Sequence, residues 1–385
     1  FYTDMANLHM PKLTAPQTPD VQIDRPEENP NWQKTAQDIE RLTLWDVKQV
    51  YAQDNKLALE VRNSYNPDPE DRTQKAMAVL HRDAPANVEQ IEIRHFAAGA
   101  VIGVEKIDRT DWVTQQTQPA RTQEAVQPTA VQYVAQDVSG FDRRLPEKPI
   151  NWSAEPGLDV AQTTGGPDGY LYAFQGNLKL GLELPWNIKG ASTLSVRLYD
   201  NYQNFIDPGS SQLPRVRTQI KDFLTTSRTN ISNLTLSKTD RLSDSWYWAG
   251  YGGYFESMFG GFGTEVLYRQ PGARWGIGAD YNNVRLRDFH QNLKFQELRA
   301  TTGHVTGYWE TPWDGVIASL GAGQYLAGDK GYTATLSRVF HNGTTIVGYF
   351  TRTNVPKELF GEGSFDKGIA LKPLQCGMVL ETYSP

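Results

Sequence analysis

The chain has 385 residues, of which 21% are charged and 39% are hydrophobic, and its formal net charge is −6. This charge, without a long basic stripe, argues against a nucleic-acid partner, because phosphate binding depends on clustered lysines and arginines. The single cysteine, Cys376, excludes an internal disulfide and a metal site built from several thiolates. No run of about 18 apolar residues predicts a membrane-spanning helix, but the alternating strands of a β-barrel contain no such run either.

The first part of the sequence predicts a small soluble α/β module between two linkers. A short helix is expected over 32–45, and Leu57, Leu59 and Val61 alternate with less apolar neighbours as in a strand. A turn signal at 66–69 begins a helix over 70–82. Two more strands, at 88–96 and 100–108, complete a β-α-β-β unit. The boundaries predicted are a linker or disordered arm at 1–32, the module at 33–112 and a second linker at 113–165.

After residue 165 the pattern changes to long alternating strands. Large apolar residues occupy every second position from Tyr170 to Trp186, with Gly176 as the one gap. A soluble strand usually has about 5–6 residues, whereas a strand that crosses a bilayer needs about 10. The alternation recurs in about ten or eleven candidate strands, joined by tight turns and one long polar excursion over 202–227.

These features predict a mainly β fold, in which an antiparallel transmembrane β-barrel over 166–371 follows a small periplasmic α/β domain. The segment 372–385 is an atypical tail, so closure of the barrel by this chain alone stays open. Several tryptophans fall near the proposed strand ends, where an aromatic girdle is expected. These are Trp186, Trp246, Trp248, Trp309 and Trp313.

The residue patterns predict no enzyme, no metal site and no cofactor. The six histidines are scattered, without metal-ligand spacing. The glycine-dense segment 251–263 lacks the lysine-serine ending of a phosphate-binding loop, and glycines facing aromatic residues in curved strands explain it better. Glycoside hydrolysis needs two carboxylates roughly 5 to 9 Å apart, which a sequence cannot establish. The carboxylates considered are Glu256, Glu265, Asp280 and Glu310, and we interpret them as polar groups of a water-filled lumen.

A local basic cluster lies in LPRVRTQIKDFL, residues 213–224. Its members are Arg215, Arg217 and Lys221. They could contact an acidic polymer or lipid headgroups, or form a solvated loop face, and the sequence leaves both interpretations open.

Several motifs, in the order in which they occur, resemble the YjbH/GfcD family of outer-membrane exopolysaccharide and capsule proteins. They are YGGYFESMFGGFGTEVLYR (251–269), GIGADYNNVRLRDF (276–289), TTGHVTGYWET (301–311), YLAGDKG (325–331) and GEGSFDKGI (361–369), and LPRVRTQIKDFL is similar too. The resemblance implies an outer-membrane barrel that acts with periplasmic partners in secretion or assembly of an exopolysaccharide. It also implies that this chain is the C-terminal part of a longer protein. It supplies no catalytic residue, and the sequence departs from the family pattern after Ile369.

We therefore predict a Gram-negative outer-membrane barrel, with a periplasmic N-terminal segment, that guides or scaffolds an exopolysaccharide or capsule polymer without being an enzyme. The expected partners are outer-membrane lipid, the exopolysaccharide and periplasmic polysaccharide-export proteins. The alternative is a soluble all-β carbohydrate-binding or carbohydrate-active protein, whose apolar face a second sheet must cover. The residues expected along the lumen or polysaccharide path are Lys179, Glu183, Arg197, Arg215, Arg217, Arg274, Asp280 and Glu310.

Overall fold

The protein is described here by a computed structural model, which divides into two compact units, Phe1–Lys148 (unit 1) and Pro149–Pro385 (unit 2). No helix among the described residues is both long enough and apolar enough to cross a membrane. The structure describes residues 30–62, 69–97, 99–117, 129–132, 140–146, 150–164, 170–205, 219–313, 315–340, 344–356 and 366–372.

Unit 1 is built on a six-stranded sheet with the strand order β5-β4-β3-β2-β1-β6. β2 and β3 are parallel, because α3 connects them as a crossover, and the other pairs are antiparallel. The predicted β-α-β-β order corresponds to β2, α3, β3 and β4. The elements are α2 (Trp32–Thr43), β1 (Asp46–Gln53), β2 (Lys56–Arg62), α3 (Pro69–Asp83), β3 (Gln90–Ala97), β4 (Ala100–Asp108), α4 (Arg109–Thr117), β5 (Thr129–Gln132) and β6 (Asp142–Arg143).

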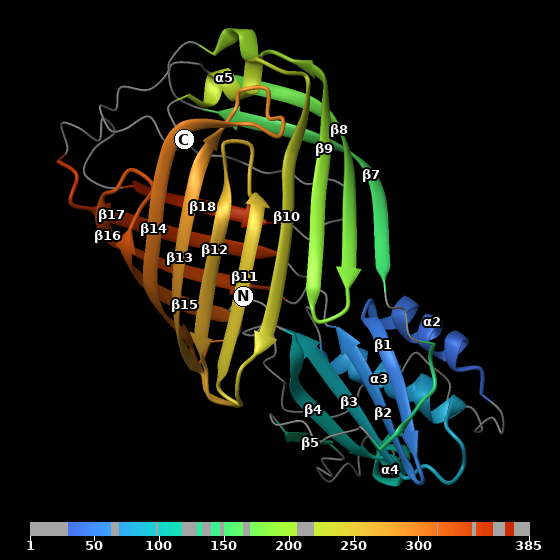
Figure 1. Ribbon diagram of the computed structural model, residues 1–385. Helices are drawn as coiled ribbons and strands as arrows, with labels where there is room; N and C mark the ends of the chain where they lie inside the picture. Colours follow the sequence, from blue (N-terminus) through green and yellow to red (C-terminus); the bar gives the residue numbers. More distant parts are fainter. Residues whose placement is uncertain are drawn as a thin grey trace. The chain divides into compact units, whose positions relative to one another are not determined.

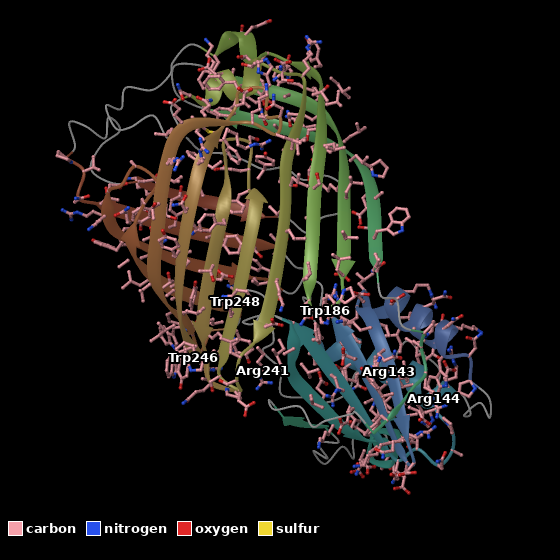
Figure 2. All side chains as sticks on the ribbon, in the orientation of Figure 1. Arg143, Arg144, Trp186, Arg241, Trp246 and Trp248 are labelled. Atoms are coloured by element: carbon pink, nitrogen blue, oxygen red, sulfur yellow. The ribbon has the colours of Figure 1, made fainter. Side chains whose placement is uncertain are left out.

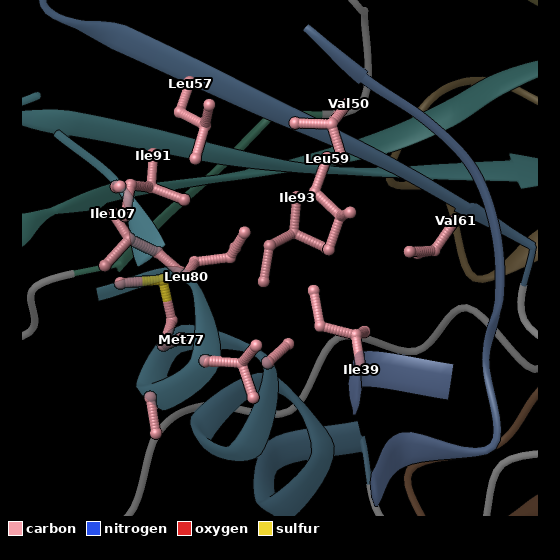
Figure 3. Packing of buried hydrophobic residues seen from close by; sticks show 14 of the residues in the cluster. Ile39, Val50, Leu57, Leu59, Val61, Met77, Leu80, Ile91, Ile93 and Ile107 are labelled. Carbon is pink, nitrogen blue, oxygen red and sulfur yellow. The ribbon is translucent and has the colours of Figure 1, made fainter. Parts of the chain in front are cut away.

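The core of unit 1 lies between one face of this sheet and helices α2 and α3 (Figure 3). Period-two alternation places Leu57, Leu59 and Val61 of β2 on the face that the helices cover, and all three are fully buried. Ile39 of α2 and Met77 of α3 pack against them. This core is what an independently packed α/β module requires.

Arg109, the first residue of α4, fixes the C-terminal end of α3. Its guanidinium donates to the carbonyl oxygens of His81 (2.9 Å) and Ala84 (3.2 Å), and to those of Pro85 (2.7 Å) and Val88 (2.9 Å). Arg109 Nε also donates to Nδ1 of His81 at 3.0 Å. Burial, and then the positive charge of Arg109, lower the pKa of His81 below its usual 6.5. The imidazole therefore acts as a neutral acceptor here.

Unit 2 contains one twelve-stranded antiparallel sheet in which every strand pairs with its neighbours in sequence, from β7 at one edge to β18 at the other. The sheet curls strongly, so that β16–β18 run behind β12–β14 in Figure 1. Its elements are β7 (Asn151–Thr164), β8 (Tyr170–Leu184), β9 (Ile188–Asp200), η1 (Tyr202–Asn204), α5 (Ile220–Thr225), β10 (Thr229–Arg241), β11 (Trp246–Tyr254), β12 (Phe259–Tyr268), β13 (Trp275–Arg287), β14 (Phe295–Glu310), β15 (Val316–Gln324), β16 (Lys330–Val339), β17 (Thr345–Thr353) and β18 (Asp366–Lys372).

The mainly β, antiparallel organisation of the second part is confirmed. The predicted strands from Tyr170 onward correspond to β8–β18. The linker expected over 113–165 differs from the structure, which contains the end of α4, both short strands β5 and β6, and the long strand β7 in this range. β5, β6 and β7 owe their extended form to pairing with β4, β1 and β8, which their polar composition does not reveal.

Candidate functional site: the polar face of the long sheet

The sheet of unit 2 has one apolar and one polar face. Apolar and polar residues alternate along each strand, and the register places apolar residues beside apolar ones and polar residues beside polar ones on the neighbouring strand. Leu178 of β8 lies opposite Leu194 of β9, which lies opposite Ile231 of β10. One position along, Asn177, Ser195 and Asn230 form the matching row on the other side of the sheet. We call these sides the apolar face and the polar face.

The apolar face is exposed along the middle of the sheet, although its side chains are large. Ile277, Val305 and Leu320 are 49%, 58% and 58% exposed. Soluble proteins rarely leave a continuous apolar surface of this extent uncovered. Other exposed members of this face are Leu158, Phe174, Leu178, Leu180, Leu182, Val196, Leu234, Leu236, Phe262, Leu336, Ile346, Phe350 and Ile369.

An aromatic row crosses the apolar face at one end of the strands. The ring centroids of Trp246 and Tyr268 are 5.1 Å apart and those of Tyr268 and Trp275 are 5.9 Å apart, while Trp275 lies opposite Trp309. Figure 2 shows Trp186 and Trp246 toward this same end, where the short turns between strands lie. Trp309 and Trp313 of the predicted girdle also lie at this end. Trp309 is next to the last residue of β14, and Trp313 lies in the β14–β15 turn.

The predicted path residues of β8 and β9 share the polar face. Lys179 lies opposite Glu155 of β7 and Thr193 of β9. Glu183 is 3.8 Å from Nζ of Lys189, and Nε of Arg197 is 2.9 Å from Oδ2 of Asp200. Each of these charged side chains lies near one of opposite charge, on the neighbouring strand or nearby in the sequence. Such pairing keeps the net charge of the polar face low.

The other predicted path residues lie in different places and do not form one group. Glu310 lies on the polar face but is only 7% exposed, and its Oε1 is held by Arg269 Nη2 at 2.6 Å. Arg274 is exposed in the turn before β13 and contributes its carbonyl oxygen to the Glu310 amide. Arg215 and Arg217 lie outside the described residues. Asp280 lies near the middle of the polar face and belongs to the cluster described next.

A chain of polar contacts, which we call the inner polar track, crosses the polar face from β11 to β17. Oη of Tyr251 donates to Oδ1 of Asn282 (2.8 Å), and Nδ2 of Asn282 donates to Oδ2 of Asp280 (3.0 Å). Nδ1 of His304 is 3.3 Å from both carboxylate oxygens of Asp280. The His304 ring packs edge-on against Tyr325, whose hydroxyl is 2.6 Å from that of Thr333. Thr333 in turn lies 2.8 Å from Thr351.

Glycines allow the aromatic rings of this region to lie along the sheet. A Cβ placed on Gly263 would collide with Asn282 and with the ring of Tyr251, and a Cβ on Gly278 would come within 3.3 Å of the ring of Tyr308. The rings therefore occupy space that a side chain on the neighbouring strand would take. Within the glycine-dense sequence 251–263, Gly263 makes room for the ring of Tyr251, whereas Gly253 and Gly261 lie against the backbone carbonyls of Leu234 and Asn283.

Two described parts of the connection between β9 and β10, η1 and α5, pack against the polar face at the end opposite the aromatic row. Tyr202 is buried against Leu171 and Ala173 of β8, and Phe223 of α5 is buried in a cluster with Val284 of β13. Nε2 of Gln291 donates to the carbonyl oxygen of Phe223 at 2.7 Å. The described parts of this connection, η1 and α5, thus pack against β8 and β13.

Arg287, at the end of β13, joins several segments near the same end. It is fully buried, and its guanidinium donates to carbonyl oxygens of β10, of the β11–β12 turn and of the β13–β14 turn. Its guanidinium carbon also lies 4.5 Å from the centre of the Tyr254 ring. The acceptors are the carbonyls of Ile231, Ser232, Glu256 and Gln291.

Comparison with known families assigns the chain. The profile of the family described as "Exopolysaccharide biosynthesis protein YbjH" matches residues 1–382. The chain belongs to the YjbH family. Among curated proteins, it is similar to "Uncharacterized lipoprotein YjbH" of Escherichia coli (strain K12), with 38% identity over 216 residues, which is 54% of this chain and 31% of that protein. The chain thus matches less than a third of the length of this relative.

Among solved structures, this YjbH-family chain is similar to one described as "Crystal structure of the COG4313 outer membrane channel from Pseudomonas putida F1". The identity is 12%, the match covers 58% of this chain and 91% of that chain, and the TM-score is 0.25.

Sequence reasoning identified Asp280 of the YjbH-family chain but missed most of its neighbours on the inner polar track. Tyr251, Asn282 and His304 come from three different strands, and only the register places them together. The available signal was polar residues at the alternate positions of strands β13 and β14, which carry Asp280, Asn282, Thr302 and His304. Within the described ranges, no three histidine, cysteine or acidic side chains are grouped so that they could hold a metal ion.

Proposed function

We propose that this YjbH-family chain forms a β-barrel in the bacterial outer membrane and guides or scaffolds an exopolysaccharide there. The observation that carries the proposal is the sheet with two unlike faces, one exposed and apolar with an aromatic row, the other polar. Exposed apolar side chains are unfavourable in water, and unpaired polar side chains are unfavourable in lipid. The proposal therefore places lipid against the apolar face and a hydrated lumen against the polar face.

The strand lengths support this location. β8 has 15 residues, β13 has 13 and β14 has 16. A tilted strand needs about 9–11 residues to span the hydrocarbon layer. The aromatic row from Trp246 to Trp309 lies where one interface of the bilayer meets the sheet, as in the girdles of outer-membrane barrels. The word lipoprotein in the name of the Escherichia coli relative also supports an envelope location.

The topology supports an orientation. β7 begins at Asn151, which pairs with Glu183 near the short β8–β9 turn, so the chain enters the sheet at the end that carries the aromatic row. The opposite end carries the longer connections, including 201–228 and 354–365. Outer-membrane barrels have short periplasmic turns and longer external loops. We therefore place unit 1 in the periplasm, where polysaccharide-export proteins are its proposed partners.

Closure of the sheet is part of the proposal. β7 and β18 are the edges of the sheet, and backbone groups at an unpaired edge cannot be satisfied in lipid. We propose that these edges are paired in the membrane. The lumen then acts passively on the polymer, with its charged and hydroxyl side chains in contact with it and without chemical change.

Envelope fractionation tests the proposal. The full protein, expressed with an export signal, is expected in the outer membrane, and its band in detergent gels should shift on boiling, because folded barrels resist unfolding by detergent. Deletion of the segment 150–372 should abolish polymer secretion. Recovery as a soluble protein without detergent, or secretion that persists after the deletion, contradicts the proposal and favours the soluble carbohydrate-binding alternative.

A further inference from the structure

We infer that the apolar face carries a binding site for a lipid whose sugar headgroup bears phosphate groups, at the end of the sheet opposite the aromatic row. The inference rests on the proposed function, since it names the lipid that covers this part of the barrel. The site is a belt of cationic side chains on β13–β18, which we call the basic rim (Figure 1). Its members are Arg285, Arg299, Lys330, Arg352 and Lys367.

The first two members of the basic rim lie on β13 and β14. Arg285 is directly opposite Arg299. Both continue the alternation that places Ile277 and Val305 on the apolar face. Arg299 is exposed, and the guanidinium carbon of Arg285 lies 5.8 Å from the centre of the Phe295 ring. Like charges directly opposite each other destabilise a sheet, and an anion bound between the two guanidinium groups offsets their repulsion.

The other three members form a diagonal row on β16, β17 and β18. Arg352 lies opposite Tyr332, two residues from Lys330. Lys367 lies opposite Phe350, two residues from Arg352. Diagonal neighbours of this kind are about 7–8 Å apart, which is within reach of long side chains. Because Lys330, Arg352 and Lys367 are all exposed, their charged ends can converge on one anionic group.

Apolar and aromatic side chains adjoin the diagonal row on the side toward the middle of the sheet. Tyr332, Phe350 and Ile369 are exposed on the same face. The rings of Tyr332 and Phe350 pack against each other, with their centroids 6.0 Å apart. A ligand that fits here needs acyl chains for this surface and negative charge for the row beside it. This combination is the chemistry of an anionic lipid.

The basic rim lies about one bilayer height from the aromatic row. From Arg299 to Trp309, β14 rises about 33 Å at about 3.3 Å per residue. A strand tilt of about 40° reduces this rise to about 25 Å, the height of the apolar band of outer-membrane barrels. Lysine and arginine at such a boundary extend their charged ends to the headgroups while their methylene groups stay against apolar surface. In the proposed orientation, these are the headgroups of the outer leaflet.

The carboxylates near the basic rim leave its diagonal row cationic. Glu297 follows the alternation of Arg299 on the apolar face, but β14 is two strands away from β16. Asp366 lies opposite Thr351 and therefore faces the polar side of the sheet. Asp329 lies in the turn before Lys330. The charge that this row presents to lipid is therefore positive.

The extent of the rim favours a headgroup with several negative charges. From β13 to β18 it spans about 24 Å, at about 4.8 Å per strand. A phosphate monoester carries about −1.5 to −2 charges at pH 7. The phosphodiester of an ordinary phospholipid has a single ionisable oxygen and a narrow headgroup. A sugar headgroup with more than one phosphate monoester therefore fits the width and the charge of the rim better.

Native mass spectrometry tests the site with the full protein extracted from the outer membrane in detergent. The probes are lipid A with two phosphates, the same lipid without phosphates, and phosphatidylglycerol. We expect the diphosphorylated lipid to bind at least ten-fold more tightly than either of the others. K330Q and R352Q should each weaken its binding about five-fold, which corresponds to about 1 kcal/mol for each cation. R338Q removes an exposed cation of the same face at the other end of β16 and should bind as the unchanged protein does.

Each variant must retain the band shift on boiling, which establishes that the barrel is folded. Equal binding of the lipid with and without phosphates, or equally tight binding of phosphatidylglycerol, overturns the site. Equal losses in R338Q and in the two rim variants, or no loss in K330Q and R352Q, do so as well. Hexagalacturonate should not displace the diphosphorylated lipid, and displacement would assign the rim to an acidic polymer instead.

The two proposals fail in different ways. A heat-shifting outer-membrane protein that gives any of these contrary results loses the lipid site but keeps the proposed function. Recovery as a soluble protein without detergent removes the barrel and the lipid site together.

Discussion

Trp275 of β13 and Trp309 of β14 lie directly opposite each other on the apolar face and are 43% and 50% exposed. Two facing indoles in the surface of a sheet are unfavourable in water, since each leaves a large apolar area hydrated. At a bilayer interface the same rings pack among lipid chains with the indole N–H toward the headgroups. The exposed pair therefore favours lipid, which the barrel proposal places at this face, over water, which the soluble alternative would place there.

A charge at the middle of the apolar face provides a direct measure of the environment. Leu320 lies near the middle of β15, and Leu320→Arg is expected to destabilise a membrane-embedded sheet by about 2–4 kcal/mol. The readout is the temperature at which the folded band disappears in detergent gels, together with the amount in the outer membrane. Ser319→Arg, one residue away on the polar face, is the matched control and should have little effect. If both variants are equally stable, the apolar face is in water.

The second prediction concerns the buried guanidinium of Arg287. Arg287→Met leaves the carbonyls of Ile231, Glu256 and Gln291 without this donor, and an unsatisfied buried acceptor costs about 1–3 kcal/mol. Arg287→Lys should recover only part of the loss, because an ammonium group cannot reach all of these acceptors at once. Thermal unfolding in detergent, followed by circular dichroism, measures both. Arg285→Gln, which removes a donor to the Gln296 carbonyl (3.1 Å), should lose less. Equal losses in the two positions contradict the role of Arg287.

The third prediction uses two glycines of the sheet. Gly263→Ala should destabilise the protein by about 1–3 kcal/mol, because the added methyl group collides with Asn282 and the ring of Tyr251. Gly307→Ala is the control, since nothing lies within 4 Å of its Cβ position. Its stability should be unchanged or slightly higher. Urea unfolding in detergent measures the free energy of unfolding of both variants. If Gly263→Ala is as stable as the unchanged protein, the Tyr251 ring can move away from the added methyl group.

The fourth prediction is a pH dependence in unit 1. The pKa of His81 is lowered in the folded state, so the unfolded chain binds the proton more strongly. Stability is therefore unaffected well above pH 6.5 and falls as the pH drops below 6.5 toward the folded pKa. Hydrogen exchange of α3 peptides in the full protein, corrected for the intrinsic rate, should accelerate between about pH 7.5 and 5.5. The His81→Gln variant should lose most of this dependence, and an identical response in both proteins would rule out His81 as its source.

The alternation of apolar residues predicted the long strands well, because it reflects the local period of an extended chain. The alternation from Tyr170 to Trp186 is one example: β8 covers Tyr170–Leu184 of it, and Trp186 lies in the turn before β9. The neighbouring strand β7 was missed, since Pro156 and Gly157 interrupt its middle and both disfavour an interior strand. An edge strand tolerates them, and only the order of the sheet identifies β7 as an edge.

The candidate site was less accessible to sequence reasoning. Whether a residue faces the polar side follows from its position in the alternation, and the register places Asp280 and Glu310 on that side. Their partners depend on register, which no local pattern specifies. Glu310 therefore proved to be engaged by Arg269, whereas Asp280 proved to be joined to Asn282 and His304.

The pairing of every strand in unit 2 with its sequence neighbours has a consequence for how the sheet assembles. Contacts between nearby residues form fastest, and a longer loop adds only about 0.6 kcal/mol of closure cost for each doubling of its length. The sheet can grow hairpin by hairpin without waiting for distant segments to meet. The excursion 201–228 separates a block of three strands, β7–β9, from the remainder, β10–β18. We expect the docking of these two blocks to be the slowest step of folding.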